Sequence, residues 1–518
     1  MEQPIQSLAD IARVQGRVRP DKVAFRFEGR ETTFAAFDRH TNQVANGLAA
    51  MGVKDGERIC YLGKNSDHYF ELLIGASKIG AVMTPINWRL AGPEIAYIAA
   101  DSGAQVLFHG AGFADAARSV AAETPALTRL IEMESQYETW RDSQSDVDTG
   151  HQPAPEDAAM QLYTSGTTGR PKGAVLPTRG FFGLRGASED SQAEWSKWSD
   201  TDVSLVAMPC FHIGGSGWGI SGLYYGATGV VMAEFDPTRV LDYFVAHGVT
   251  KLFLVPAAMQ IVLRQPNVRE VDYSRLKYIL YGASPIPLDL LREAVEVFGC
   301  GFVQMYGMTE TTGTIVALPP EDHTLEGNPR MRSAGKALPG VEVAILGPDG
   351  ERLPPGEVGE IASRSVANMS GYWNLPDATR ATLGEDGWLR TGDAGYMDAD
   401  GYVYIHDRVK DMIISGGENI YPAEVESAIY GHPAVADVAV IGVPDETWGE
   451  AVKAMVVLKE GADADSAQII SHARTRIAGY KCPKSVEFIP ALPRNPSGKI
   501  LRRELRAPYW AGRDRGVN

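Results

Sequence analysis

The sequence predicts an α/β protein with a large N-terminal domain of layered parallel sheets and helices, a small β-rich layer, and a small α+β C-terminal domain. The chain has 518 residues, 44% of them hydrophobic and 22% charged, which is a globular composition in a chain long enough for several structural units. Helix-like and strand-like patterns alternate along most of it. This pattern changes after about Val341 and again after Asp407, which predicts first the β-rich layer and then the separate domain.

The alternation begins near the N-terminus. Residues 33–51 carry apolar side chains at helical spacing, and Gly52 ends this predicted helix. Residues 58–62 (RICYL) predict a short strand, residues 67–78 a helix, and residues 81–86 a second buried strand. Further strand patterns occur at residues 203–208, 250–255 and 277–281. Strands that alternate with helices in this way are typical of parallel sheets covered by helices.

A glycine-rich segment, residues 213–233, carries no charge over 21 residues and is long enough to span a bilayer. It also contains seven glycines together with Ser216, Ser221 and Tyr224. We interpret it as a buried, closely packed segment, so no transmembrane segment is predicted. The N-terminal residues contain no long apolar run, and no signal peptide is expected.

The β-rich layer is predicted from short strands at residues 341–346, 357–363 and 402–407, which are separated by the turn sequences GPDG and PPG. Beyond it, the order of patterns is β-β-α-β-β-α-β, and Pro422 opens the first helix. We therefore expect an N-terminal domain over residues 1–409 and a C-terminal domain over residues 410–518. No Ser/Gly-rich linker lies between them, so their connection is expected to be a short hinge.

Charge and cysteine content exclude several classes of protein. There are 49 Lys+Arg against 65 Asp+Glu, a net charge of −16, which argues against broad nucleic-acid binding. From Lys410 onward there are 14 basic and 14 acidic residues, so the excess acid lies in the first 409 residues. The four cysteines are far apart and form no CxxC pair, which excludes a disulfide scaffold and a zinc ribbon and fits a reducing, cytoplasmic location.

The strongest local motif is residues 162–173, LYTSGTTGRPKG, in which a strand-like pair runs into hydroxyl side chains, glycines and Lys172. Glycine allows backbone N–H groups to approach a phosphate, hydroxyls donate further bonds, and lysine adds a positive charge. The motif is not a Walker A loop, because Lys172 is followed by Gly173 rather than by Ser or Thr, which argues against a P-loop kinase or NTPase. A polar surface turn is the alternative interpretation.

This segment resembles the phosphate loop of the adenylate-forming superfamily, which includes acyl- and aryl-CoA synthetases, luciferases and peptide-synthetase adenylation domains. Other motifs of that superfamily follow in the same order, and the resemblance covers residues 163–499. They are residues 209–212 (PCFH, acyl pocket), 281–284 (YGAS) and 306–310 (YGMTE, adenine site), 388–393 (WLRTGD, ribose), 407–411 (DRVKD, hinge) and 496–499 (PSGK, C-terminal catalytic motif).

The resemblance implies activation of a carboxylic acid. A carboxylate oxygen attacks the α-phosphate of ATP to give acyl-AMP and pyrophosphate, and a thiol then displaces AMP. The implied cofactors and substrates are ATP, Mg²⁺, coenzyme A and a small-molecule carboxylic acid. Because two anions meet in the first step, cations and preorganised donors must offset their repulsion.

The resemblance also implies roles for individual residues. The phosphate loop is expected to consist of Thr164, Ser165, Gly166, Thr167, Thr168, Gly169 and Lys172. The adenine site is expected to consist of Gly282, Ala283 and Tyr306. Asp393 is expected to hold the ribose, and Arg408 to contact the ribose and phosphate. Glu310 is expected to hold Mg²⁺ and Thr309 to contact the α-phosphate. Judged alone, Glu310 could instead be a carboxylate at a helix N-terminus, Tyr306 a core residue, and Asp393 a turn residue.

The two steps need different groups around one acyl phosphate. The resemblance implies a mobile C-terminal domain that rotates about Lys410. Lys499 orients the carboxylate in the first step, whereas a loop containing Ser415, Gly416 and Gly417 admits pantetheine in the second. From composition alone, Lys499 could belong to a solvated basic tail, since four arginines lie nearby.

The acyl pocket is expected to include Phe211, Gly214, Gly215, Trp218, Gly307 and Met308. Amino-acid-activating members of the superfamily place an acidic residue where this chain has His212, and no carboxylate follows until Glu234, so an α-amino acid substrate is not expected. By resemblance His212 borders the acyl site and moves an aromatic gate, although it could also be a packed histidine. Small residues with Trp218 as a floor favour a small-to-medium fatty or aryl acid.

Alternative functions stay open at this point. Within the superfamily they are an acyl-AMP ligase that loads a carrier protein and a luciferase-like oxygenase. Outside enzymes, a nucleotide-binding regulator could keep the phosphate loop, but it would have little reason to keep Glu310, Lys410 and Lys499 together. The oligomeric state is not fixed by the sequence, and a homodimer stays open.

Overall fold

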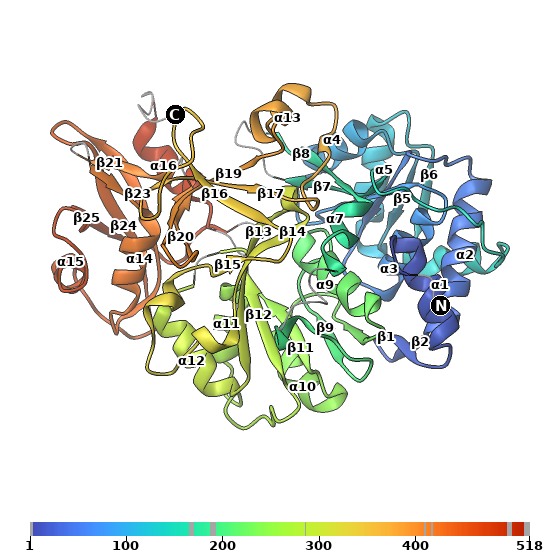
Figure 1. Cartoon of the computed structure of the whole chain (residues 1–518), viewed down its shortest axis with the longest axis horizontal. Helices are drawn as coiled ribbons and strands as arrows, with labels where there is room; N and C mark the ends of the chain where they lie inside the picture. Colours follow the sequence, from blue (N-terminus) through green and yellow to red (C-terminus); the bar gives the residue numbers. More distant parts are fainter. Residues whose placement is uncertain are drawn as a thin grey trace.

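The computed structural model describes residues 4–164, 170–186, 193–284, 286–408, 411–415, 418–494 and 500–511. It has a large N-terminal domain with two mainly parallel sheets and a small antiparallel sheet, followed by a small C-terminal domain (Figure 1). This is the predicted α/β architecture. The predicted domain boundary at residues 409 and 410 falls on residues that the structure does not describe.

A nine-stranded sheet has the order β15-β14-β13-β12-β11-β9-β10-β1-β2. Its interior pairs are parallel, whereas β2, β14 and β15 are antiparallel additions at the edges. The strands are β1 (Val23–Phe27), β2 (Arg30–Thr33), β9 (Val203–Val206), β10 (Thr228–Val231), β11 (Lys251–Leu254), β12 (Tyr278–Gly282), β13 (Gly301–Met308), β14 (Gly313–Leu318) and β15 (Lys336–Ala337). The helices that alternate with them include α9 (Ile213–Tyr224), α10 (Pro237–His247), α11 (Pro256–Leu263) and α12 (Leu288–Phe298).

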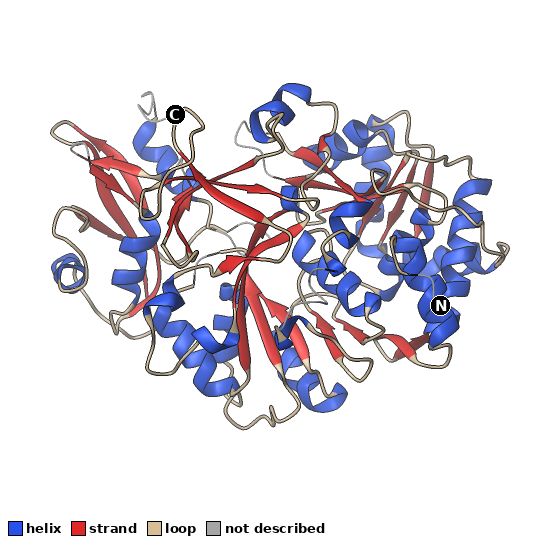
Figure 2. Ribbon diagram, viewed as in Figure 1, coloured by secondary structure: helices blue, strands red, loops and turns tan. Residues whose placement is uncertain are grey.

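A seven-stranded sheet has the order β18-β8-β7-β4-β3-β5-β6, again parallel inside with antiparallel β8 and β18 at one edge. Its strands are β3 (Arg58–Leu62), β4 (Val82–Ile86), β5 (Val106–His109), β6 (Arg129–Glu132), β7 (Ala158–Thr164), β8 (Lys172–Pro177) and β18 (Gly371–Tyr372). The helices of this half are α1 (Leu8–Val18), α2 (Phe34–Ala50), α3 (Asp67–Ser77), α4 (Gly92–Ser102), α5 (Ala114–Glu123), α6 (Glu138–Asp142), α7 (Thr178–Phe182) and α13 (Pro376–Thr382). Figure 2 shows helices beside both large sheets.

The remaining two sheets match the predicted β-rich layer and C-terminal unit. The layer is antiparallel, in the order β16-β17-β19-β20. The C-terminal domain contains β22-β21-β24-β23 with β25 beside β24, and helices pack on this sheet. The bounds are β16 (Glu342–Leu346), β17 (Gly359–Arg364), β19 (Leu389–Met397), β20 (Val403–Arg408), β21 (Ile413–Ser415), β22 (Glu418–Ile420), α14 (Pro422–Tyr430), β23 (Val435–Asp445), β24 (Gly449–Leu458), α15 (Ser466–Arg474), β25 (Ser485–Phe488) and α16 (Arg502–Trp510).

The glycine-rich segment forms α9 and β10, and its close packing is confirmed. A Cβ on Gly215 would lie 2.3 Å from the carbonyl oxygen of Pro209, and one on Gly219 would lie 2.2 Å from the ring of Phe70. Both contacts are too short for any side chain, so glycine is required for α9 to approach its neighbours. Among the described residues, no helix is both long and apolar enough to cross a membrane.

A buried carboxylate ties together the helices on the seven-stranded sheet. Glu71 of α3 lies 2.7 Å from Nδ1 of His40 and accepts hydrogen bonds of 2.9 Å from the Tyr137 hydroxyl and from Nη1 of Arg141. Burial alone would raise the pKa of Glu71, but the hydrogen bond with His40 and the charges of His68, His40 and Arg141 outweigh it and lower this pKa to about 2. Glu71 is therefore ionised in the folded protein at any physiological pH.

We predict that Glu71→Gln lowers the free energy of unfolding by about 3–5 kcal/mol, because it removes the buried charge partner of Arg141 and leaves only the exposed Asp142. Chemical denaturation of both proteins measures this. Since the folded-state pKa lies below the unfolded one, this stabilisation is complete above the unfolded pKa near 4.5 and is lost as the pH falls toward 2. Asp115→Asn, in the exposed pair with Arg118, is the control and should change nothing measurable. Equal effects of the two substitutions would contradict the assignment.

Candidate functional site

The predicted phosphate loop connects β7 to β8, and its two ends are paired. Thr164 and Lys172 face each other in the antiparallel register of these strands. The Thr164 hydroxyl donates to Oε1 of Glu310 at 3.3 Å, and the Tyr372 hydroxyl donates to the same oxygen at 2.7 Å. The Lys172 ammonium lies 4.4 Å from the centre of the Tyr372 ring. The structure thus brings Thr164, Lys172 and Glu310 close together around Tyr372, and their roles toward ATP stay a prediction.

Glu310 lies in the short 3₁₀ turn Thr309–Thr311, directly after β13, and only 5% of its surface is exposed. Its side-chain donors are neutral hydroxyl groups, and it forms no ion pair with another described residue. No cluster of three metal-ligating side chains occurs in the described part of the chain. A single buried carboxylate beside a phosphate loop fits Mg²⁺, which takes most of its ligands from phosphates and water.

A second pair joins β13 to the β-rich layer. The Tyr306 hydroxyl donates to Oδ2 of Asp393 at 2.8 Å, and Asp393 is only 8% exposed. Asp393 lies within β19, and its backbone is opposite that of Arg408 in β20. The structure does not describe the Arg408 side chain. The predicted adenine and ribose residues therefore lie side by side in the fold.

Backbone geometry in the adenine motifs requires small residues. A Cβ on Gly282 would lie 2.0 Å from the carbonyl oxygen of Met305, and one on Gly307 would lie 1.9 Å from that of Gly313. Ala283 adopts a φ of +67°, a left-handed conformation that is strained for any residue other than glycine. Such strain is typical of segments held in place for a ligand rather than for packing alone.

His212 immediately precedes α9, and its ring lies 4.6 Å from that of Phe211. Its Nε2 atom is buried and has no hydrogen-bond partner among the described residues. Burial, together with the charge of Arg89, lowers the pKa of His212 to about 4. At neutral pH the imidazole is therefore uncharged and keeps one ring nitrogen for a ligand.

One side of α9 is only half-buried, and it carries Ile213, Gly214, Gly217, Ser221 and Tyr224. A Cβ on Gly214 would lie 3.0 Å from the ring of Phe253, which the sequence did not single out. Gly215 belongs to the buried side and serves packing. Trp218 is also buried; its N–H donates to the Leu205 carbonyl, and its ring lies 5.1 Å from that of Trp198. Its role as the floor of an acyl pocket stays a prediction.

Other predicted residues occupy the same region or fall outside the description. Gly307 and Met308 end β13, beside Tyr306. Ser415 ends β21, opposite Glu418 and Gly449. Residues outside the described part are Ser165, Gly166, Thr167, Thr168, Gly169, Lys410, Gly416, Gly417 and Lys499.

Two functional candidates were missed by the sequence analysis. Tyr372 belongs to no recognisable motif, and only the fold brings it to Glu310. Phe253 lies in β11, where an aromatic residue indicates core packing rather than a pocket. No signal in a single sequence distinguishes either one from an ordinary buried aromatic residue.

Comparison with known proteins agrees with this geometry. The AMP-binding enzyme family matches residues 12–373, and the AMP-binding enzyme C-terminal domain matches residues 424–499. The fatty acid–[acyl-carrier-protein] ligase ScoC of Streptomyces coeruleorubidus is 42% identical over 515 residues, covering 99% of this chain and 98% of its own. A feruloyl-CoA synthase of an Amycolatopsis species is 42% identical over 497 residues, covering 96% of this chain and 97% of its own.

Among solved structures, the anthranilate CoA ligase AuaEII in complex with anthranoyl-AMP superposes with a TM-score of 0.90 at 29% identity, covering 97% of each chain. The chain belongs to the AMP-binding enzyme family, the adenylate-forming superfamily that its motifs resemble. It is an ATP-dependent, AMP-forming acid–thiol ligase.

We predict that the His212 imidazole stays neutral from about pH 8 down to about pH 5, whereas an exposed histidine titrates near pH 6.5. NMR of protein labelled in its histidine rings measures this, and His212→Asn identifies the signal by removing it. Because the folded-state pKa lies below the unfolded value near 6.5, the contribution of the neutral ring to stability is complete above pH 6.5 and is lost as the pH falls from there toward 4. A His212 signal with a midpoint near pH 6.5 would overturn this description of a desolvated ring.

Proposed function

We propose that the protein is an acyl-CoA synthetase for a small-to-medium fatty or aryl acid. It activates the acid as acyl-AMP with release of pyrophosphate and then transfers the acyl group to coenzyme A with release of AMP. The proposal rests on two groups of residues that meet at the end of β13. One is Glu310 with its donors Thr164 and Tyr372, and the other is the Tyr306–Asp393 pair. Residues proposed to bind phosphate, metal and nucleoside thereby lie around the end of one strand.

In the adenylation step, the phosphate loop and Lys172 hold the phosphates that leave as pyrophosphate. Tyr306 stacks on adenine, Asp393 accepts from the ribose hydroxyls, and Thr309 contacts the α-phosphate. Glu310 would hold Mg²⁺, which when bound offsets the negative charge of the phosphates. Lys499 then orients the carboxylate and stabilises the charge that develops on the α-phosphate.

In the thioester step, the C-terminal domain rotates about Lys410 and withdraws Lys499. The loop that follows Ser415 then faces the acyl-AMP, where its glycines leave room for pantetheine. Arg408, which precedes the hinge, stays close to Asp393 by strand pairing and can contact the ribose and phosphate in either arrangement.

The proposed acid carries no α-amino group. Glu234, the carboxylate next in sequence after His212, is paired with Lys64 at 2.7 Å and with Arg89 at 3.4 Å, so it is not free to bind a substrate ammonium. The half-buried side of α9 with its two glycines, and Phe253 opposite Gly214, offer an apolar surface. An apolar surface without a free charge favours an alkyl or aryl tail.

Coenzyme A is the acceptor that the C-terminal domain supports. Trp448 is 47% exposed, and the Lys484 ammonium lies 5.6 Å from its ring centre. Tyr480 is similarly exposed, beside Lys481. Exposed aromatic rings with adjacent cations suit a nucleotide carrying phosphates. An acyl-carrier protein is the second candidate acceptor, since ScoC, 42% identical over nearly the whole chain, is named for that acceptor.

We further propose a cytoplasmic location, where ATP and coenzyme A are available. All four cysteines are free thiols in the structure, and Cys60, Cys210 and Cys482 are buried. Free cysteines are typical of proteins kept in a reducing compartment.

A matched pair of assays over a panel of acids tests the function. One follows acid-dependent pyrophosphate release with hydroxylamine as the trap, and the other follows loss of the free thiol of coenzyme A. We expect the same small-to-medium fatty or aryl acids to drive both. Pyrophosphate release with persistence of the thiol would assign another acceptor, and adding an acyl-carrier protein identifies it. Undiminished use of long-chain acids would contradict the proposed size of the acyl pocket.

We predict that Tyr372→Phe raises the Mg²⁺ concentration needed for half-maximal pyrophosphate release by about tenfold, because the hydroxyl that orients Glu310 is lost. A titration of Mg²⁺ at fixed ATP measures it. Tyr402→Phe is the matched control, since the Tyr402 hydroxyl also donates to a buried carboxylate, that of Asp322, at 2.8 Å. An unchanged Mg²⁺ dependence in Tyr372→Phe would remove Tyr372 from the site.

A further inference from the structure

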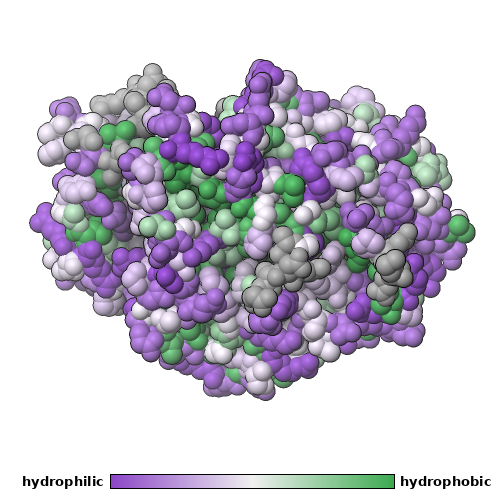
Figure 3. Space-filling view, viewed as in Figure 1, coloured by the Kyte–Doolittle hydropathy of each residue, from purple (hydrophilic) through white to green (hydrophobic). Residues whose placement is uncertain are grey.

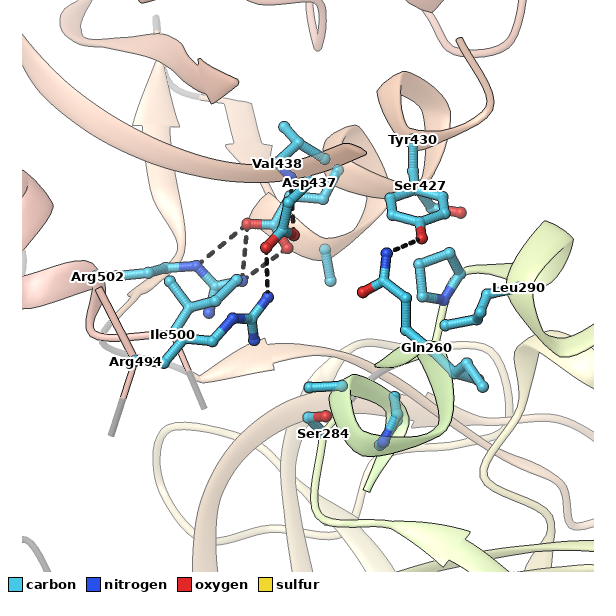
Figure 4. Close-up of a pocket in the computed structure, with 16 residues that line it drawn as sticks. Gln260, Ser284, Leu290, Ser427, Tyr430, Asp437, Val438, Arg494, Ile500 and Arg502 are labelled. Atoms are coloured by element: carbon cyan, nitrogen blue, oxygen red, sulfur yellow. Dashed lines mark hydrogen bonds and ion pairs between the residues drawn. The ribbon is translucent and has the colours of Figure 1, made fainter. Parts of the chain in front are cut away.

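A cavity of about 120 Å³ lies between the two domains (Figure 4). Residues of the N-terminal domain form one wall, and residues of α14, β23 and the C-terminal segment form the other. In the space-filling view, hydrophobic side chains gather in the middle of the molecule and polar ones cover its rim (Figure 3). The two domains therefore meet across an incompletely filled interface rather than a continuous core.

One side chain of the N-terminal domain, that of Gln260, donates two hydrogen bonds to the C-terminal domain. Gln260 lies on α11, and its amide nitrogen donates to the Tyr430 hydroxyl at 2.6 Å (Figure 4). The same nitrogen donates to the Ala436 carbonyl at 3.2 Å. Tyr430 ends α14, and Ala436 lies in β23, so one amide group contacts two elements of the C-terminal domain. Burial raises the pKa of Tyr430, which keeps its hydroxyl protonated.

The cavity also lies beside the adenine motif. Ser284, which follows the strained Ala283, lines one wall, and Arg494 and Ile500 line the other. Arg494 and Ile500 pair as an antiparallel bridge and flank residues 495–499, which lie outside the described part of the chain. Arg494 is held by Asp437 at 2.7 Å. Arg494 and Ile500 thus lie across the cavity from the adenine motif.

The other functional segment of the C-terminal domain lies elsewhere. Figure 1 shows β21, which carries Ser415, at the outer part of that domain, away from the N-terminal domain. β21 thus lies away from the N-terminal domain, whereas Arg494 and Ile500 lie on the side of the C-terminal domain that faces the adenine motif. The contacts made by Gln260 exist only in such an arrangement and must break if the domain rotates.

We propose that Gln260 is a positioning residue that holds the C-terminal domain in the adenylation arrangement and releases it for the thioester step. The proposal rests on the two-step function proposed above. The contact is strong enough to bias the arrangement and weak enough to break, because it consists of two hydrogen bonds beside a cavity. The nearby ion pair between Arg476 and Asp289 is long, at 3.9 Å, and both side chains are substantially exposed.

The test measures the two half-reactions separately in Gln260→Ala. Adenylation is followed as acid-dependent pyrophosphate release, and thioester formation is started from preformed acyl-AMP. We expect the ratio of the adenylation rate to the thioester rate to fall by about three- to tenfold, the size expected for one or two lost hydrogen bonds. Gln265→Ala is the matched control, because among the described residues the Gln265 side chain bonds to Thr238 and Ile261, both in the N-terminal domain.

Tyr430→Phe provides a second, milder variant, which removes one of the two acceptors and should lower the same ratio by about two- to threefold. Combined with Gln260→Ala it should add nothing further, since both substitutions remove the same contact. A parallel loss of both half-reactions, or an unchanged ratio, would overturn the proposal. Failure of the underlying function is a different result, because the unmodified protein would then not release pyrophosphate with any acid.

Discussion

The hydrogen bonds that converge on Glu310 connect the two large sheets. Glu310 follows β13 of the nine-stranded sheet, whereas its donors Thr164 and Tyr372 end β7 and β18 of the seven-stranded sheet. The backbone of Met369 also donates to the Glu310 carbonyl at 2.8 Å. A buried carboxylate must keep its hydrogen bonds, so these contacts fix the ends of both sheets relative to each other. The two ends of the predicted phosphate loop, Thr164 and Lys172, therefore lie near the end of β13.

Close approach of the backbone also brings the β-rich layer to the end of β13, where the two large sheets meet. Gly282 and Gly307 leave no room for a Cβ, which lets β12, β13 and β14 come together without side chains between them. Tyr306 can then reach Asp393 of the β-rich layer. In this family member, the residues of the site are adjacent because three sheets meet at one strand end, which explains why motifs spread over more than two hundred residues act together.

The sequence predicted the architecture well because periodicity and motifs are local. Alternating patterns predicted strands that correspond to β3, β4, β9, β11 and β12, and the family motifs supplied residues such as Glu310 and Asp393 that the fold places near the end of β13. The alternatives left open for single residues required the fold. Glu310 lies in a 3₁₀ turn, too short for a helix dipole, and bonds to hydroxyls instead. Asp393 lies in a strand rather than a turn. Tyr306 is partly buried, as a core residue would be, but its hydroxyl bonds to Asp393.

What could not be predicted depends on contacts between distant segments. The sequence contains 20 tyrosines, and nothing local distinguishes Tyr372 from the others. Only the pairing of β18 with β8 brings Tyr372 to Glu310. The basic C-terminal stretch contains α16, whose Trp510 N–H donates to the Gly442 carbonyl at 3.0 Å. The sequence does not predict this helix, because it contains several arginines and an internal Pro508. Packing on β23, rather than local helix propensity, stabilises it.

The chemistry explains why the domains are joined by contacts that can separate. Both half-reactions occur at one acyl phosphate, so the groups that serve the first must leave before those of the second can enter. A large apolar interface would fix one arrangement, because separating it would expose its area to water. Polar contacts such as that between Gln260 and Tyr430 separate at lower cost, since water replaces the lost hydrogen bonds. Hydrogen bonds beside a cavity therefore suit a two-step enzyme with one active site.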